Sequence, residues 1–267
     1  MCTAFIVAIV CGAVDAQAPV PSKPLPFGIV DNSFLVEEAF NQEPGIVQNI
    51  VSFTKAGAGE WTTVFTQEWP IPDITHQFSY TLPLSRIDRR TGVGDVLINY
   101  RFQALSETAA RPAFAPRLSV VLPTGDGDTG FGSGALGWQV NLPFSKQAGD
   151  VYFHWNSGFT YTPHVKADSE RGHRATLFSP FVAGSVIWQA SPRLNLLLEI
   201  VSSSEQYIAD DGVRARNDQI VFSPGARHAW NLIEKQIVVG AALPVTVSQD
   251  SSVALLAYVS YEVRFKK

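Results

Sequence analysis

Residues 134–144 read GALGWQVNLPF, and the alternation in this stretch decides the fold. Every second position is large and apolar (Leu136, Trp138, Val140, Leu142 and Phe144), and the positions between them include Gly137, Gln139 and Asn141. Successive side chains of a β-strand point to opposite faces, so one face of this segment is apolar and the other is small or polar. The stretch therefore predicts a strand that separates two different environments.

The same period-2 alternation recurs along the rest of the chain. It predicts strands over 46–55, 60–69, 74–83, 93–103, 114–122, 134–144, 150–161, 175–189, 193–204, 217–230, 235–246 and 252–265. Most of these segments have about ten residues, which suits a tilted strand that crosses a bilayer. The sequence contains no long segment of helical period and no solenoid repeat, so we expect an all-β chain.

Alternation alone does not say which face is inside, because a soluble sandwich would bury the apolar face. Aromatic residues on the apolar faces gather near strand ends, as the interfacial girdles of a membrane barrel require (Trp61, Trp69, Trp138, Phe144, Tyr161, Trp188 and Trp230). Charged residues stand in mid-strand on the polar faces, where a solvated lumen suits them better than a dry core. Both features favour a barrel with a polar lumen.

Loop lengths favour the same fold. With both barrel ends in the periplasm, the outward connections include 123–133, 162–174 and 205–216, whereas the inward turns 70–73, 145–149, 190–192 and 231–234 are short. Two connections break this asymmetry, since 104–113 is long and 248–251 is short. We therefore predict a transmembrane antiparallel β-barrel of about twelve strands in the bacterial outer membrane, with the lipid bilayer as its surroundings.

The N-terminal region precedes the predicted barrel. Residues 3–14 are apolar and small residues follow at Ala16 and Ala18, so we expect residues 1–18 to be a signal peptide, although a buried strand is the alternative and the true start and cleavage site stay open. Cys2 and Cys11 lie within this segment, and Val10 argues against a lipoprotein site at Cys11. We expect 19–45 to be a periplasmic leader segment and 46–267 to be the barrel. For the acids at 37, 38 and 43, a lumen plug and a periplasmic lead-in strand are both open.

The polar faces of the predicted strands converge on one lumen. The pore-lining candidates are Asp95, Asn99, Arg101, Arg117, Asn141, His154, Asn156, Glu199 and Arg227. Charges of both signs that face one lumen can pair structurally, or they can set the selectivity of a pore. The sequence leaves both possibilities open.

Other chemistries find little support. The chain has a net charge of −4 and no basic face, which argues against nucleic acid as a partner. His154 and Ser157 are three positions apart on a strand and point to opposite faces, so they do not form a hydrolase pair. Asp126 and Asp128 in a glycine-rich loop are too few for a calcium loop, and the histidines lack metal-ligand spacing. We expect no enzyme activity, no cofactor and no metal.

The last strand ends in an aromatic pattern. Tyr261, Val263 and Phe265 alternate near the C-terminus and resemble the signal by which barrel proteins are recognised for membrane insertion. Usually the aromatic residue is the last one, whereas Lys266 and Lys267 follow here. The pattern implies the barrel-assembly machinery as a partner.

Three short motifs resemble one protein family. They are Gly92-Val-Gly-Asp95 before a strand, Leu122-Pro-Thr-Gly125 at the end of the next strand, and the early block from Asn32 to Gly45. Their order and spacing resemble the family called MetA-pathway of phenol degradation over most of residues 31–265. That resemblance implies an outer-membrane barrel that transports solutes, and it assigns no functional residues.

Two functions follow from these observations. The first is a porin-like channel or transporter for small, hydrophobic or aromatic solutes, and the alternative is a non-transporting structural or adhesive barrel that acts through its outer loops. The outer loops are moderate in length and not repetitive, which favours transport over adhesion.

Overall fold

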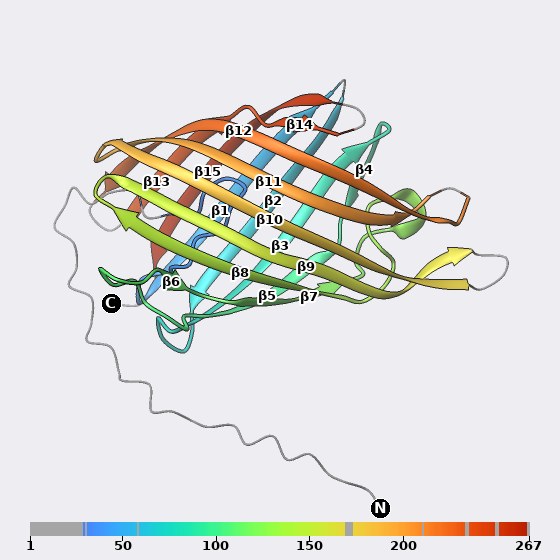
Figure 1. Cartoon of the computed structure of the whole chain (residues 1–267), viewed down its shortest axis with the longest axis horizontal. Coiled ribbons are helices and arrows are strands. Elements are labelled where there is room, and N and C mark those ends of the chain that lie inside the picture. The colour runs from blue at the N-terminus through green and yellow to red at the C-terminus, as the bar shows by residue number, and fades with distance from the viewer. Residues whose placement is uncertain are drawn as a thin grey trace, which may run out of the picture.

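The computed structural model describes residues 29, 31–57, 59–168, 173–209, 211–232, 235–248 and 251–265. These residues form one sheet of fifteen strands in which β1 pairs with β15, so that the sheet closes into a barrel (Figure 1). The barrel strands are β1 (Ile46–Ala56), β2 (Glu60–Pro70), β3 (His76–Ile87), β5 (Val96–Phe102), β7 (Arg117–Leu122), β8 (Gly137–Ala148), β9 (Val151–Asp168), β10 (His173–Ser191), β11 (Leu194–Ile208), β12 (Arg214–Leu232), β13 (Lys235–Ala242) and β15 (Ser252–Arg264). The short strands β4 (Arg90–Val93), β6 (Ala113–Phe114) and β14 (Val245–Val247) pair beside them.

The predicted all-β fold is confirmed, as a closed antiparallel barrel of twelve strands. Each predicted segment became one barrel strand, and the first and last predicted segments pair from Ile46↔Arg264 to Ala56↔Ala254. Closure gives each barrel strand a neighbour on both sides, so most backbone hydrogen bonds of the described strands are satisfied within the wall.

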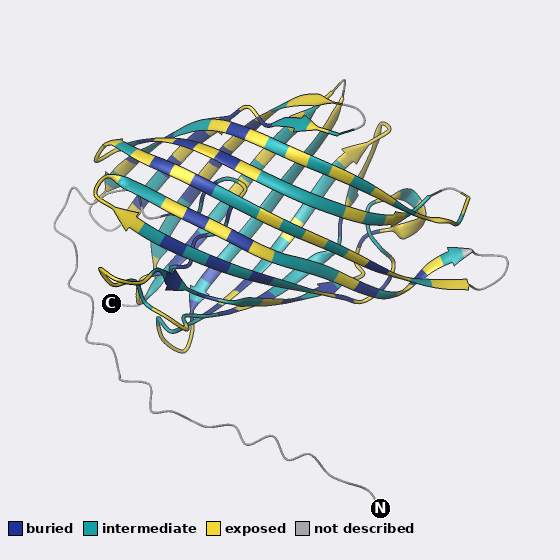
Figure 2. Ribbon diagram, in the orientation of Figure 1, coloured by how far each residue is buried: buried dark blue, intermediate teal, exposed yellow. Residues whose placement is uncertain are grey.

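The apolar faces point outward. On β10, Val186 is 45% exposed whereas the adjacent Ser185 is 3% exposed, and this alternation of exposed and buried residues runs along the strands (Figure 2). An exposed apolar surface around a buried polar interior is the reverse of a soluble protein and matches a barrel in lipid. The location in the bacterial outer membrane is confirmed on this basis.

Aromatic residues form a belt at each end of this outer surface. Trp69, Trp155, Trp188 and Trp230 lie towards the strand ends nearest the C-terminus, and Trp61, Trp138 and Tyr161 lie towards the opposite ends. Indole and phenol groups prefer the boundary between lipid and water, so the two belts mark the edges of the apolar zone.

The two long outer connections differ from the prediction. Residues 162–174 and 205–216 were expected to be loops, but β9 continues to Asp168, β10 begins at His173, β11 continues to Ile208 and β12 begins at Arg214. These hairpins project beyond the barrel at the end opposite the C-terminus (Figure 1). Above a bilayer both faces of a hairpin meet water, so the apolar alternation stops although the strand does not.

The irregular inward connection contains a small strand of its own. After β5 the chain makes an isolated bridge from Leu105 to Phe114, and β6 then pairs with β8. Phe114 stacks on Phe144 with ring centroids 4.4 Å apart, which packs this connection against the barrel wall.

Several expectations fall outside the described residues. They include the signal peptide over 1–18 with Cys2 and Cys11, the leader residues 19–28, and the two C-terminal lysines. Among the described residues, no helix is long and apolar enough to cross a membrane.

Residues 31–42 lie inside the barrel, and we call them the plug segment. In Figure 1 this segment is the blue trace that winds within the wall before β1 begins. The expectation of a periplasmic position for residues 19–45 is therefore wrong for the plug segment. Its polar groups find partners on lumen side chains, and this keeps the segment inside.

Candidate functional site

The plug segment begins at Asp31, which is buried against the wall. Its carboxylate accepts hydrogen bonds from Gln48 Nε2 at 2.6 Å, Tyr258 Oη at 2.8 Å and Ser260 Oγ at 2.6 Å. Arg227 Nη1 donates to the main-chain carbonyls of Asp31 and Asn32. Strands β1, β12 and β15 therefore hold the start of the segment together.

The middle of the segment contacts β11, β10 and β9, which adjoin β12 in the wall. Ser33 Oγ lies 2.6 Å from Ser185 Oγ on β10, and Glu199 Oε1 on β11 accepts from the amides of Leu35 at 2.7 Å and Val36 at 3.1 Å. Asn156 on β9 both accepts from the Glu37 amide and donates to the Glu37 carbonyl. No described strand pairs with the plug segment, so side chains of the wall supply hydrogen-bond partners for its backbone groups.

The end of the segment returns towards β1. Ser145 Oγ on β8 accepts from the Ala39 amide at 2.7 Å, and Gln77 on β3 accepts from the Gln42 amide at 2.9 Å. The plug therefore makes polar contacts with β1, β3, β5, β7 to β12 and β15, which is nearly the whole circumference. The segment therefore spans the lumen between most of the wall strands.

Glu37 provides the strongest single contact of the plug. Its Oε1 lies 3.0 Å from Arg101 Nη1, and its Oε2 lies 2.8 Å from Arg117 Nε. Asn141 Nδ2 donates to the same Oε2 at 2.7 Å. Charge-assisted bonds of this kind are about twice as strong as neutral ones.

The plug carboxyls differ in charge state. Burial alone would raise the pKa of Glu37, but Arg117 and Arg101 outweigh it and hold that pKa below its ordinary value. Burial and the neighbouring Asp31 carboxylate raise the pKa of Glu38 to about 8. Burial also raises the pKa of Asp31, although Arg227 opposes the shift. Glu37 is therefore ionised at neutral pH, whereas Glu38 retains a proton over much of the neutral range.

Phe34 anchors the plug by packing. Its ring lies 5.0 Å from the Tyr258 ring and covers two lumen-facing glycines, Gly225 and Gly240. A methyl group at Gly225 would come within 2.9 Å of Phe34 Cε2, and one at Gly240 would overlap the ring. The two glycines therefore form a recess in the wall that fits this side chain.

The structure brings most of the sequence-predicted lumen residues together around the plug. Those that contact it directly are Arg101, Arg117, Asn141, Asn156, Glu199 and Arg227. Asn99 bonds to Ser79 and accepts from Arg117, and His154 bonds to Ser145 and meets the Phe40 ring edge-on. From the sequence, pairing among the wall charges and contact with a solute were both open. In the structure, most of these side chains bind the plug.

Asp95 has a different position. At the outer end of the barrel its carboxylate accepts from the amides of Gly125 and Ser133 and from Ser133 Oγ. Thr124 Oγ1 donates to the Gly94 carbonyl and accepts from the Val96 amide. The motifs at 92–95 and 122–125 thus form a clasp that fixes the outer loop 123–136.

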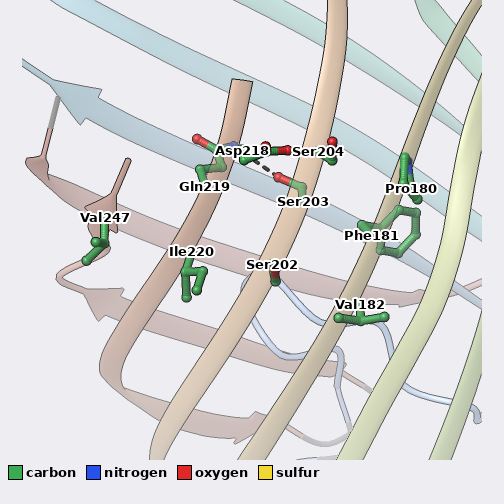
Figure 3. Close-up of a pocket in the computed structure, with 10 residues that line it drawn as sticks. All are labelled: Pro180, Phe181, Val182, Ser202, Ser203, Ser204, Asp218, Gln219, Ile220 and Val247. Carbon is green, nitrogen blue, oxygen red and sulfur yellow. Dashed lines mark hydrogen bonds between the residues drawn. The ribbon is translucent and has the colours of Figure 1, made fainter. Parts of the chain in front are cut away.

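A recess opens on the wall of the outer half (Figure 3). It has a volume of about 480 Å³ and is lined by residues of β10, β11, β12 and β14: Pro180, Phe181, Val182, Ser202, Ser203, Ser204, Asp218, Gln219, Ile220 and Val247. Backbone pairing between β10 and β11 ends beside it, at Phe181↔Ser203. Beyond that point Gln206 Oε1 accepts from the Phe178 amide, so a side chain replaces the ladder. The recess is mainly apolar at its surface.

The structure does not bring His154 and Ser157 together. His154 and Ser157 face opposite sides of β9, since His154 is buried and Ser157 is exposed. Among the described residues, no three His, Cys, Asp or Glu side chains gather where they could hold a metal ion.

Sequence reasoning missed several residues of the site: Asp31, Ser33, Phe34, Gln48, Gly225, Gly240 and Tyr258. The available signal was weak. The plug segment carries three acidic residues and no basic one, and the lumen face carries three buried or partly buried arginines. Charge complementarity between these two sets would have favoured the plug over the lead-in strand.

Comparison with known proteins supports the fold. No protein-family model matches the chain, and no curated protein sequence matches it. An outer membrane channel from Pseudomonas putida F1 aligns with a TM-score of 0.61 and 13% identity, over 88% of this chain and 99% of that one. The NanC porin aligns with a TM-score of 0.52 and 10% identity, over 83% of this chain and all of that one. At these identities the likeness shows that the chain has the fold of outer-membrane barrels.

Proposed function

We propose that this protein is an outer-membrane channel whose passage is closed by the plug segment and opens when that segment leaves the lumen. The observation that carries the proposal is the way in which the plug is held. Its backbone is bound by single side chains such as Glu199, Asn156 and Ser145, and no β-ladder ties it to the wall. Contacts of this type can break without opening the barrel itself.

We infer a small solute with an apolar or aromatic body. Two observations support this: the recess beside Phe181 with its apolar surface, and the resemblance to a family linked to phenol degradation. Val182, Ile220 and Val247 give the recess apolar surface on the lipid-facing side of the wall, where an apolar solute can bind.

A disulfide lock tests the channel proposal. Ser33 Oγ and Ser185 Oγ lie 2.6 Å apart, so Ser33→Cys with Ser185→Cys places two thiols within bonding range. In a planar bilayer we expect the oxidised double variant to be silent and the reduced protein to conduct. Ser33→Cys alone is the control and should not respond to oxidant. Equal conductance of the oxidised and reduced double variant would contradict a mobile plug.

The projecting hairpins favour the adhesive alternative. The β9–β10 and β11–β12 hairpins extend beyond the barrel and present charged residues to the outside, among them Lys166, Arg174 and Arg216 (Figure 1). If neither redox state of the locked variant conducts, and shortening these hairpins abolishes cell attachment, the adhesive function replaces the channel.

We also propose that the C-terminal strand is recognised by the barrel-assembly machinery. Tyr261 and Val263 alternate with the exposed Val259 on the lipid-facing side of β15, next to the closing contact with β1, and Phe265 directly follows the strand. The Phe265 amide donates to the Gly45 carbonyl at 2.9 Å, so this pattern sits where the barrel closes.

A further inference from the structure

Two arginines face each other directly across neighbouring strands. Arg101 on β5 pairs in register with Arg117 on β7, and both side chains point into the lumen. Like charges in directly opposite positions destabilise a sheet. An anion between the two guanidinium groups removes this repulsion, so the pair is built to hold one.

Among the described residues, the wall side chains that accept hydrogen bonds from these guanidinium groups are neutral. Gln77 Oε1 accepts from Arg101 at 3.0 Å, while Asn99 Oδ1 and Gln139 Oε1 each accept from Arg117 at 2.9 Å. In the described part of the chain, the carboxylate paired with either arginine is that of Glu37. The neutral acceptors orient both guanidinium groups but do not neutralise their positive charge, which can therefore attract an anionic ligand.

The carboxylate that contacts both arginines belongs to the part that has to move. Glu37 uses both carboxylate oxygens, one on Arg101 and the other on Arg117 and Asn141. When the plug leaves the lumen, this carboxylate leaves with it. Two guanidinium groups and one amide from β5, β7 and β8 then remain without their acceptor.

We propose that Arg101, Arg117 and Asn141 form a binding site for the carboxylate of a small organic acid, which Glu37 occupies while the channel is closed. The inference rests on the proposed function, because a solute reaches the site only along the lumen. Planar, two-point recognition of this kind suits a carboxylate. A solute carboxylate and Glu37 compete for the same donors, so the solute favours the open state.

Direct binding tests the site separately from conduction. Glu37→Gln removes the resident carboxylate, and full-length folded variants in detergent are titrated with benzoate, with benzamide and with inorganic phosphate. We expect saturable binding of benzoate to Glu37→Gln. Benzamide should bind Glu37→Gln at least about tenfold more weakly, because it lacks the charged acceptor. Benzoate should bind the parent at least about tenfold more weakly, because Glu37 already occupies the donors. Adding Arg117→Gln should weaken benzoate binding about tenfold or more. Arg264→Gln in the same background removes an equal charge from the exposed rim and should leave it unchanged.

Several results would overturn the inference. They are equal affinity for benzoate and benzamide, tighter binding of phosphate, and benzoate affinity that Arg117→Gln does not alter. If Arg117→Gln fails to fold, Asn141→Ala in the Glu37→Gln background removes one donor without changing charge and should weaken binding several-fold. Conduction that ignores the disulfide lock would reject the mobile plug while leaving this titration valid.

Discussion

The glycine recess under Phe34 gives the sharpest test of plug docking. In Gly240→Ala the new methyl group overlaps Phe34 Cζ and lies 2.7 Å from Phe34 Cε1 and 3.0 Å from Arg227 Cβ. The wall is fixed on both sides by the pairing of β13 with β12 and β15, so the ring has to shift. Overpacking of this kind costs about 1–3 kcal/mol. We expect the undocked fraction of the plug to rise roughly 5- to 150-fold.

Labelling of a cysteine at position 33 measures that fraction. Ser33 is buried when the plug is docked, so a maleimide that does not cross membranes reacts with Ser33→Cys only after undocking. Gly184→Ala is the matched control, since a methyl group there meets nothing closer than 3.9 Å. Phe34→Ala by itself should also raise labelling, because the anchoring ring is lost. In that background Gly240→Ala should add no further increase, because the overlap is then gone. Labelling of Gly240→Ala at the control rate, or a further increase from it in the Phe34→Ala background, would refute the reasoning.

Three further predictions concern the charge of the plug, the outer clasp and the C-terminus. Docking raises the pKa of Glu38 to about 8, so the docked state holds a proton there. Docking should therefore weaken as the pH rises from about 4.5 towards 8, and Glu38→Gln should remove that part of the pH dependence of Ser33→Cys labelling. Asp95→Ala removes the acceptor of three hydrogen bonds, so proteolysis within 123–136 should become faster while the heat-modifiable barrel persists; unchanged cleavage would contradict the clasp. Phe265→Asp should sharply reduce the amount of heat-modifiable barrel in the membrane, whereas removal of only the two final lysines should be nearly silent; equal amounts from Phe265→Asp and parent would count against the assembly signal.

The wall of the barrel was predictable because lipid and lumen impose opposite demands on alternate residues. In 134–144 the outward Trp138 and Leu142 and the inward Gln139 and Asn141 could be assigned from spacing alone. Alternation weakens where both faces of a strand meet water. The sequence therefore predicts loops where β9 extends to Asp168 and β12 begins at Arg214. Alternation therefore predicts the part of a strand within the bilayer and not its full length.

The plug could not be predicted in the same way, because no period describes it. Each of its residues meets a different strand, so neighbours such as Leu35 and Glu37 bind Glu199 and Arg101 from separate parts of the wall. For Asp95, the sequence predicts the correct face of the strand but the wrong role. Its position on the polar face was read correctly, but it stands at the end of the strand, where its acceptor oxygens serve the outer loop.

The energetics of the plug explain why so few residues can control it. Ordering one backbone residue costs about 1–2 kcal/mol, and one neutral hydrogen bond returns about 0.5–1.5 kcal/mol. The backbone bonds to Asn156, Ser145 and Glu199 therefore do little more than offset the order that they impose. Docking is favoured beyond that balance by the charged contact of Glu37, by the packing of Phe34, and by the buried hydrogen bonds of Asp31 and Arg227. A solute or substitution that removes one of these contacts shifts the balance towards an undocked plug.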